Sequence, residues 1–171
     1  MKFPIAEPEN LFHMTDDRLR HMRGVAEQAY RITYQCGFGE EQARKMFVLG
    51  FLHDIGYGIA EPDRHAEAGG EVLEECGYAF SGEIAAHGDP SAELTNPLVI
   101  LDVADLTVDS HGNPVTISER IADIRERHGW DSEVTRISEQ VITRLGREVP
   151  TILLLAERIV RETRHRQSLS K

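Results

Sequence analysis

The stretch FLHDIGYG at residues 51–58 places His53 and Asp54 side by side at the end of an apolar helical run, with two glycines after them. A helix end on the surface carries titratable side chains at no cost. A buried helix end does not, because an uncompensated carboxylate in the interior costs several kcal/mol. The stretch therefore predicts either a surface helix end or a buried pair that a partner such as a metal ion neutralises.

Helix-capping residues and helical spacing dominate the chain on both sides of this stretch. Thr15, Asp16 and Asp17 offer N-caps for a first helix, and Pro97 is expected near the start of a long apolar helix or at a kink in it. Strand-like alternation is absent, and VTIS at 115–118 is too short to change this. The predicted fold class is all-α. We expect helices over about 16–35, 40–55, 64–76, 81–87, 92–108, 118–129, 131–146 and 149–166.

Length and composition describe an ordinary globular chain. With 171 residues, 40% hydrophobic and 28% charged, we expect a single domain over residues 1–171. The formal net charge of −10 argues against a nucleic-acid partner. No apolar run reaches the length of a membrane span, and MKFPIAEPENLF at 1–12 does not resemble a signal peptide, so we expect a cytoplasmic protein. Two cysteines, Cys36 and Cys76, favour neither a disulfide nor a cysteine zinc site.

Several of the eight histidines, and two aspartates, continue the apolar faces of the predicted helices. Asp54 follows the stripe Ala43, Met46, Phe47, Gly50 and Phe51, and His65 precedes the face of Gly69, Val72, Leu73 and Cys76. His87 continues the apolar face of Phe80 and Ile84, and Asp105 continues that of Leu94, Leu98 and Leu101. His21 adjoins Met22 and precedes Val25 by four residues. His53 joins this set through its neighbour Asp54. The pattern therefore predicts a buried polar cluster of His21, His53, Asp54, His65, His87 and Asp105.

Each of these residues taken alone has an ordinary explanation. A single histidine on an apolar face is usually a hydrogen-bonded core residue, Asp54 could pair with Arg44, Lys45 or Arg64, and Asp105 could cap a helix or pair with an arginine. If these separate explanations were all correct, five titratable residues would continue the apolar faces of their helices by coincidence. Imidazole and carboxylate groups in one cluster suit a first-row divalent metal.

The order of these residues resembles a known signature. His21, then His53-Asp54, then a distant Asp105 is similar to the H…HD…D pattern of the HD superfamily of metal-dependent phosphohydrolases, and HDIG at 53–56 matches the motif that names a subgroup. VADL at 103–106 fits the context of the last aspartate, although Asp102 competes for that role. The resemblance implies an HD-domain helical bundle over about 15–130, with two additional C-terminal helices over about 131–168.

Two further segments resemble HD proteins with a two-metal site. They are RHAEAGGEVLEECGY at 64–78 and EIAAHGD at 83–89. The resemblance implies that His65 and His87 hold a second metal ion, with Asp54 bridging it to a first ion that is held also by the remaining cluster residues, His21, His53 and Asp105. The bacterial symmetrical diadenosine tetraphosphatases are the most similar branch, although the loop at 55–64 is shorter here. The 5′-nucleotidase branch carries a glutamate where this chain has Tyr57.

This resemblance implies hydrolysis of a phosphate ester or anhydride of a nucleotide or small phosphorylated metabolite, by a hydroxide bound to divalent metal. We expect about two ions per chain, with iron, manganese, nickel, zinc and magnesium as alternatives. Asp54 and Arg64 are the predicted catalytic residues, with Arg64 contacting phosphate; Lys45, Arg120 and Arg125 are weaker candidates for that contact. Two other functions stay open: a di-iron oxygenase on the same fold, and a non-catalytic, metal-stabilised nucleotide-sensing module. The oligomeric state also stays open, with a homodimer as one alternative.

Overall fold

The computed structural model describes residues 14–169 and confirms the all-α class. Strand pairing among these residues is limited to one isolated bridge between Val108 and Pro114. The N-terminal stretch without signal-peptide character lies outside the described residues. The helices are α1 (Asp16–Gln35), α2 (Gly39–Leu52), α3 (His65–Glu75), α4 (Ser81–Ala86), α5 (Asn96–Asp105), α6 (Ile117–His128), α7 (Glu133–Glu148) and α8 (Pro150–Leu169), with 3₁₀ turns at Ile55–Gly58 and Pro62–Arg64.

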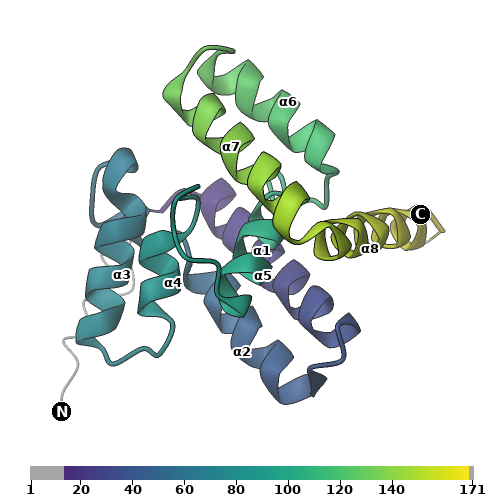
Figure 1. The fold of residues 1–171 in the computed structure, drawn as a ribbon, viewed down its shortest axis with the longest axis horizontal. Helices are drawn as coiled ribbons and strands as arrows, with labels where there is room; N and C mark the ends of the chain where they lie inside the picture. Colours follow the sequence, from purple (N-terminus) through teal and green to yellow (C-terminus); the bar gives the residue numbers. More distant parts are fainter. Residues whose placement is uncertain (1–13, 170–171) are drawn as a thin grey trace.

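The helices arrange around a central group made of α1, α2 and α5 (Figure 1). Helices α3 and α4 lie side by side at one end of the molecule, α6 and α7 form a hairpin at another, and α8 extends away to the C-terminus. Buried apolar side chains from α1, α2, α5, α7 and α8 form one hydrophobic cluster, which includes Ile32, Met46, Leu101, Leu145 and Ile159. The C-terminal helices thus share the core of the helices before them.

Capping residues set the helix starts largely as the sequence predicted. The Thr15 hydroxyl accepts a hydrogen bond from the backbone N–H of Arg18 and opens α1. Thr95 opens α5 with Pro97 in the first turn, so the proline marks the helix start and the predicted 92–108 helix is shorter at both ends. Helix α6 begins after a capping box of Thr116 and Glu119, so its N-cap lies two residues before the predicted helix start at residue 118.

Helix α2 turns inward only part of the face that the sequence predicted. Ala43, Met46 and Gly50 are buried as predicted, but Phe47 and Phe51 are exposed and Leu49 is buried in their stead. A Cβ added to Gly50 would come within 2.9 Å of the Ala26 Cα, so α1 and α2 meet backbone to backbone at this glycine. The aromatic rings lie outside that contact.

Helix α3 shows a smaller correction of the same kind. Gly69, Gly70 and Leu73 are buried, but Val72 and Cys76, which were assigned to the same face, are exposed. A Cβ on Gly70 would come within 2.6 Å of the Ala85 Cβ, so α3 packs on α4 through its glycines.

Both cysteines are free thiols, as expected from the sequence. Between residues 14 and 169, no helix combines the length and the hydropathy that crossing a bilayer requires.

Candidate metal centre

The HD dipeptide lies where α2 ends, and its two residues leave the helix differently. His53 is the C-cap residue and keeps helical angles, while Asp54 has φ −100° and ψ 13° and begins the 3₁₀ turn. The helix thus ends at Leu52, before the glycines rather than at them. Both side chains are buried, at 1% and 3% exposure. This change of backbone direction allows the consecutive side chains of His53 and Asp54 to face the same buried cluster.

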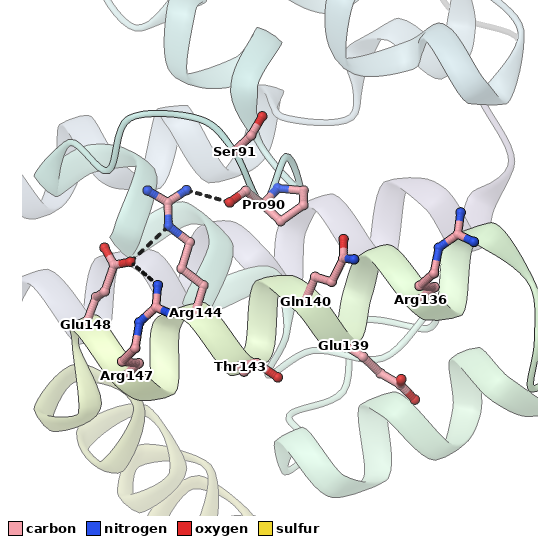
Figure 2. A pocket seen from close by; sticks show the side chains of 9 residues that line it. All are labelled: Pro90, Ser91, Arg136, Glu139, Gln140, Thr143, Arg144, Arg147 and Glu148. Atoms are coloured by element: carbon pink, nitrogen blue, oxygen red, sulfur yellow. Dashed lines mark hydrogen bonds and ion pairs between the residues drawn. The ribbon is translucent and has the colours of Figure 1, made fainter.

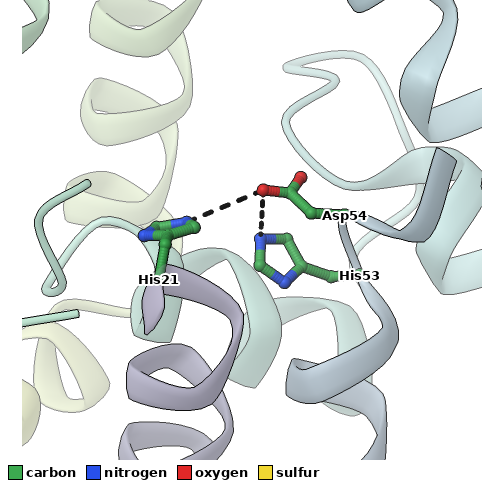
Figure 3. Close-up of side chains that lie close together, drawn as sticks. All are labelled: His21, His53 and Asp54. Atoms are coloured by element: carbon green, nitrogen blue, oxygen red, sulfur yellow. Dashed lines mark ion pairs between the residues drawn. The ribbon is translucent and has the colours of Figure 1, made fainter. Parts of the chain in front are cut away.

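The two oxygens of Asp54 each face a pair of histidines. Oδ2 lies 3.8 Å from His21 Nε2 and 3.3 Å from His53 Nε2. Figure 3 shows both contacts as dashed lines. Oδ1 lies 3.5 Å from His65 Nε2 and 3.6 Å from His87 Nε2. Two groups that could hold an ion follow from these distances, and both contain Asp54.

Asp105 joins the first of these groups from α5. Its Oδ1 lies 2.9 Å from His21 Nε2 and 4.0 Å from His53 Nε2. Asp102, the competing aspartate, is buried and points elsewhere: its Oδ1 accepts the backbone N–H of Gly88 at 3.0 Å. Burial raises the pKa of Asp102 to about 7. The geometry therefore favours Asp105 for the ligand role that the sequence assigned to it.

Backbone carbonyls orient the histidines of the first group. His21 Nδ1 lies 2.8 Å from the carbonyl oxygen of Asp109, and His53 Nδ1 lies 2.8 Å from that of Gly50. A carbonyl oxygen only accepts, so each Nδ1 carries the hydrogen and each Nε2 of a neutral ring presents a lone pair toward Asp54. Metal-binding histidines in proteins are held in the same way.

The second pair of histidines shows the same arrangement. His65 Nδ1 lies 2.6 Å from the carbonyl oxygen of Pro62, and His87 Nδ1 lies 2.6 Å from that of Ile84. Their Nε2 atoms are 3.2 Å apart. Two neutral rings held this way would turn lone pairs toward each other, so a proton or a cation is needed between them.

The electrostatics of the cluster favour a cation. Burial alone would raise the pKa of Asp54, but His53 and His87 hold it well below its usual range. Burial also opposes ionisation of Asp105, yet contact with His21 lowers its pKa strongly. Despite burial, the Asp54 carboxylate raises the pKa of His87 to about 9. Two ionised carboxylates thus lie among imidazoles that must otherwise take up protons.

The donor set fits divalent metal ions. His53 Nε2 is buried and has no hydrogen-bond partner among the described residues, which is costly unless something binds there. Imidazole nitrogen and carboxylate oxygen together suit iron, manganese, nickel or zinc. His21, His53, Asp54 and Asp105 could hold one ion, and Asp54, His65 and His87 a second.

Two residues at the edge of the cluster were missed from the sequence. The Arg18 guanidinium pairs with Asp54 Oδ2 and lies over the Tyr57 ring, 3.8 Å from its centroid. The Tyr57 ring also stacks on His65, with ring centroids 4.1 Å apart. Arg18 precedes His21 by three and Met22 by four, so the helical phase that identified His21 could also have identified it.

Of the cationic residues predicted from the sequence, Arg64 and Lys45 lie away from the cluster. Arg64 is exposed and donates to Glu67 Oε2 at 3.0 and 2.8 Å, and its contacts within residues 14–169 do not reach the cluster. Lys45 pairs with Glu41 on the surface of α2. Arg120 is different, because it is buried and its Nη2 lies 3.5 Å from Asp105 Oδ1. Contact of Arg64 with phosphate stays a prediction without support from these contacts.

A separate groove of about 780 Å³ runs beside α7 (Figure 2). Arg144 spans it and donates to the carbonyl oxygen of Pro90 at 2.8 Å, and Glu148 pairs with both Arg144 and Arg147. None of the residues that line this groove belongs to the histidine–aspartate cluster. The groove is therefore not part of the candidate metal centre.

Comparison with known families agrees with this geometry. The sequence model described as HD domain matches residues 18–108, which include all six residues of the cluster. The chain belongs to the HD domain family. No curated protein and no solved structure matches it. HD domain proteins are in general metal-dependent hydrolases, and the match ends at Val108, before α6, α7 and α8 begin.

Proposed function

We propose that this HD domain protein is a metal-dependent phosphohydrolase that acts on a phosphate ester or anhydride of a nucleotide or small phosphorylated metabolite. One observation carries the proposal: the single carboxylate of Asp54 faces two histidines through each of its oxygens. A carboxylate shared in this way is the arrangement expected of a bridging ligand between two ions. Two-metal sites are characteristic of phosphoryl-transfer enzymes.

The residues of the cluster would hold the ions and keep their geometry. Divalent ions bound there lower the pKa of water toward neutrality and polarise phosphoryl oxygens. The carbonyls that hold each Nδ1 keep the imidazoles aimed at Asp54 before any ion arrives. Since Asp54 is ionised and buried, no separate proton has to leave it when it binds a cation.

Arg18 replaces Arg64 in this proposal as the residue that neutralises phosphate charge. Its side chain is 30% exposed, and its guanidinium contacts Asp54. The Tyr57 ring packs against this guanidinium. An arginine in this position suits a phosphoryl group better than dioxygen, and this favours a hydrolase over the di-iron oxygenase alternative. The diadenosine tetraphosphatase branch stays a prediction.

Removal of Asp54 tests the proposal. In Asp54→Ala, we expect metal content after anaerobic purification to fall from about two ions per chain to almost none, and phosphatase activity to fall at least about 10³-fold. Elemental analysis and a screen over nucleotides, dinucleoside polyphosphates and sugar phosphates give the two readouts. Asp63→Ala, an exposed aspartate nine residues later, serves as the control and should retain both.

A second variant separates the two ion positions. His87→Ala should retain about one ion per chain, because His21, His53, Asp54 and Asp105 are untouched. Two ions retained in His87→Ala, or stoichiometric metal in Asp54→Ala, would contradict the bridging arrangement. An Asp54→Ala protein that loses its metal and still hydrolyses phosphate esters would contradict the proposed function.

A further inference from the structure

We propose that Arg120 determines substrate specificity: its guanidinium binds a dianionic terminal phosphoryl group at the solvent-open edge of the cluster. The inference rests on the proposed function and narrows the substrate class from any phosphate ester or anhydride to one with a terminal phosphoryl group. Arg120 belongs to α6, which follows the part of the chain matched as an HD domain. It is therefore a contribution of this chain's own C-terminal region to the site.

The location of Arg120 is the first support. Its side chain is 10% exposed, and Nη2 lies 3.5 Å from Asp105 Oδ1, the same oxygen that lies 2.9 Å from His21 Nε2. The Asp105 side chain is 28% exposed, whereas those of His53 and Asp54 are almost fully buried. Of these three side chains, Asp105 is thus the one that solvent reaches, and Arg120 contacts it.

The donors of Arg120 are the second support, because few of them are used. A guanidinium has five N–H groups. Nη1 lies 3.3 Å from Asp123 Oδ2, the contact with Asp105 is long, and Nε is buried without a partner among the described residues. Asp123 is itself shared, since Arg127 donates to it at 2.8 and 3.1 Å. A buried cation with unused donors, next to a side chain that solvent reaches, is suited to receive an anion.

The charge of the two arginines gives the substrate class. Arg18 pairs with Asp54, and Arg120 pairs with Asp105. His21 contacts both carboxylates, so the two guanidiniums lie at the two ends of one continuous set of contacts. Planar guanidiniums bind phosphoryl oxygens with paired hydrogen bonds. Two of them favour a terminal phosphoryl dianion over an internal diester, which carries one negative charge and fewer free oxygens.

The test compares Arg120→Gln with the wild type on p-nitrophenyl phosphate and on bis(p-nitrophenyl) phosphate. We expect KM for the monoester, and the inhibition constant of inorganic phosphate, to rise about tenfold or more, with a smaller change in kcat and little change for the diester. Arg120→Lys keeps the charge without the planar fork and should recover part of the loss. Arg125→Gln is the matched control on the same helix, because Arg125 pairs with Glu139 and Trp130 instead.

Metal content and thermal unfolding are measured on every variant. A folded Arg120→Gln protein with two ions and wild-type KM and phosphate affinity overturns the inference. Weaker binding of substrate and phosphate that goes together with loss of metal also overturns the inference, because Arg120 would then only hold Asp105 in place. Should Arg120→Gln not fold, the same measurements on Arg120→Lys decide.

Binding of inorganic phosphate to the metal-loaded protein, measured by calorimetry, separates the two proposals. Arg120-dependent phosphate binding in a wild type that hydrolyses no substrate supports the anion site and overturns the proposed function. Hydrolysis of monoesters that needs Asp54 and is indifferent to Arg120 supports the proposed function and overturns the inference.

Discussion

Gly56 controls how closely the HD turn and the start of α3 approach each other. A Cβ built at this position would overlap the carbonyl oxygen of His65 and come within 2.9 Å of the Gly69 amide nitrogen. Both neighbours are backbone atoms, which cannot rotate away as a side chain can. The second residue after the HD pair therefore serves the proposed second ion position: it lets His65 Nε2 come within 3.5 Å of Asp54 Oδ1.

Substitution of Gly56 should disconnect the second group of ligands from the first. Gly56→Ala is expected to destabilise the protein by about 2 kcal/mol or more, because α3 must shift, and to lower metal content from about two ions to about one per chain. Chemical denaturation and elemental analysis measure the two effects. Gly82→Ala, in α4 with open space around its Cβ, is the control and should be neutral or slightly stabilising. A Gly56→Ala protein with wild-type stability and two ions would show that α3 is not fixed at this contact.

At the level of single residues, helical phase predicted five of the titratable side chains that gather, and adjacency to Asp54 added His53. The structure brings all six together, while their roles as ligands stay predictions. Arg18 was missed although it shares the phase of His21, because arginines on a charged helix start are usually solvated. Helical phase indicates which side of a helix is buried, but it does not indicate which loop covers that side. The contact between His21 and the carbonyl oxygen of Asp109 could therefore not be predicted.

Helix α2 shows why an element can be predicted while its buried face is predicted only in part. Residues 46–52 are almost all apolar, so two neighbouring faces look equally suited to burial. The choice depends on α1: Gly50, a member of the predicted face, packs on its backbone, while Phe47 and Phe51 lie outside that contact. The buried face thus depends on the partner helix, and the spacing of apolar residues within one helix does not predict it. Existence and approximate bounds of the helices, by contrast, follow from local caps and were predicted within a few residues.

Glu119 links the start of α6 to α8 and should give a pH-dependent contribution to stability. It accepts from the Thr116 backbone N–H at 2.7 Å and from Arg164 at 2.8 Å. The hydrogen bond from Arg164, followed by those from Thr116, lowers the pKa of Glu119 from 4.5 to about 2. A lowered pKa in the folded state means that the contribution is complete above about pH 4.5 and is lost as the pH falls toward 2.

We expect Glu119→Gln to lower the free energy of unfolding by about 0.5 kcal/mol at neutral pH, since the pair is half exposed. The difference from the wild type should shrink as the pH falls from about 4.5 toward about 2. Urea unfolding at several pH values measures it, with Glu126→Gln on the exposed side of α6 as the control. A difference that stays constant over this window would mean that the charge of Glu119 is not what stabilises the link.

At the scale of the whole molecule, the shared core predicts one cooperative unit. Val141, Leu145 and Ile159 from the C-terminal helices pack in the same cluster as Ile32 and Leu101. Calorimetry of the full chain should therefore show a single unfolding transition with equal calorimetric and van't Hoff enthalpies. A chain ending at residue 130 should lack a cooperative transition, because it leaves that core open to water. Two separate transitions, or a stably folded shorter chain, would argue for independent units instead.

The histidines of the cluster come from four separate segments, namely α1, the end of α2, the start of α3 and the end of α4. An ion held by them is thus a crosslink between parts of the chain that lie far apart in sequence, and it can form only after those parts have met. Its binding free energy is added to the stability of the folded state alone. In physiological terms, the supply of metal in the cell would then set the lifetime of the folded protein as well as its activity, and scarcity would reduce its abundance before any substrate is involved.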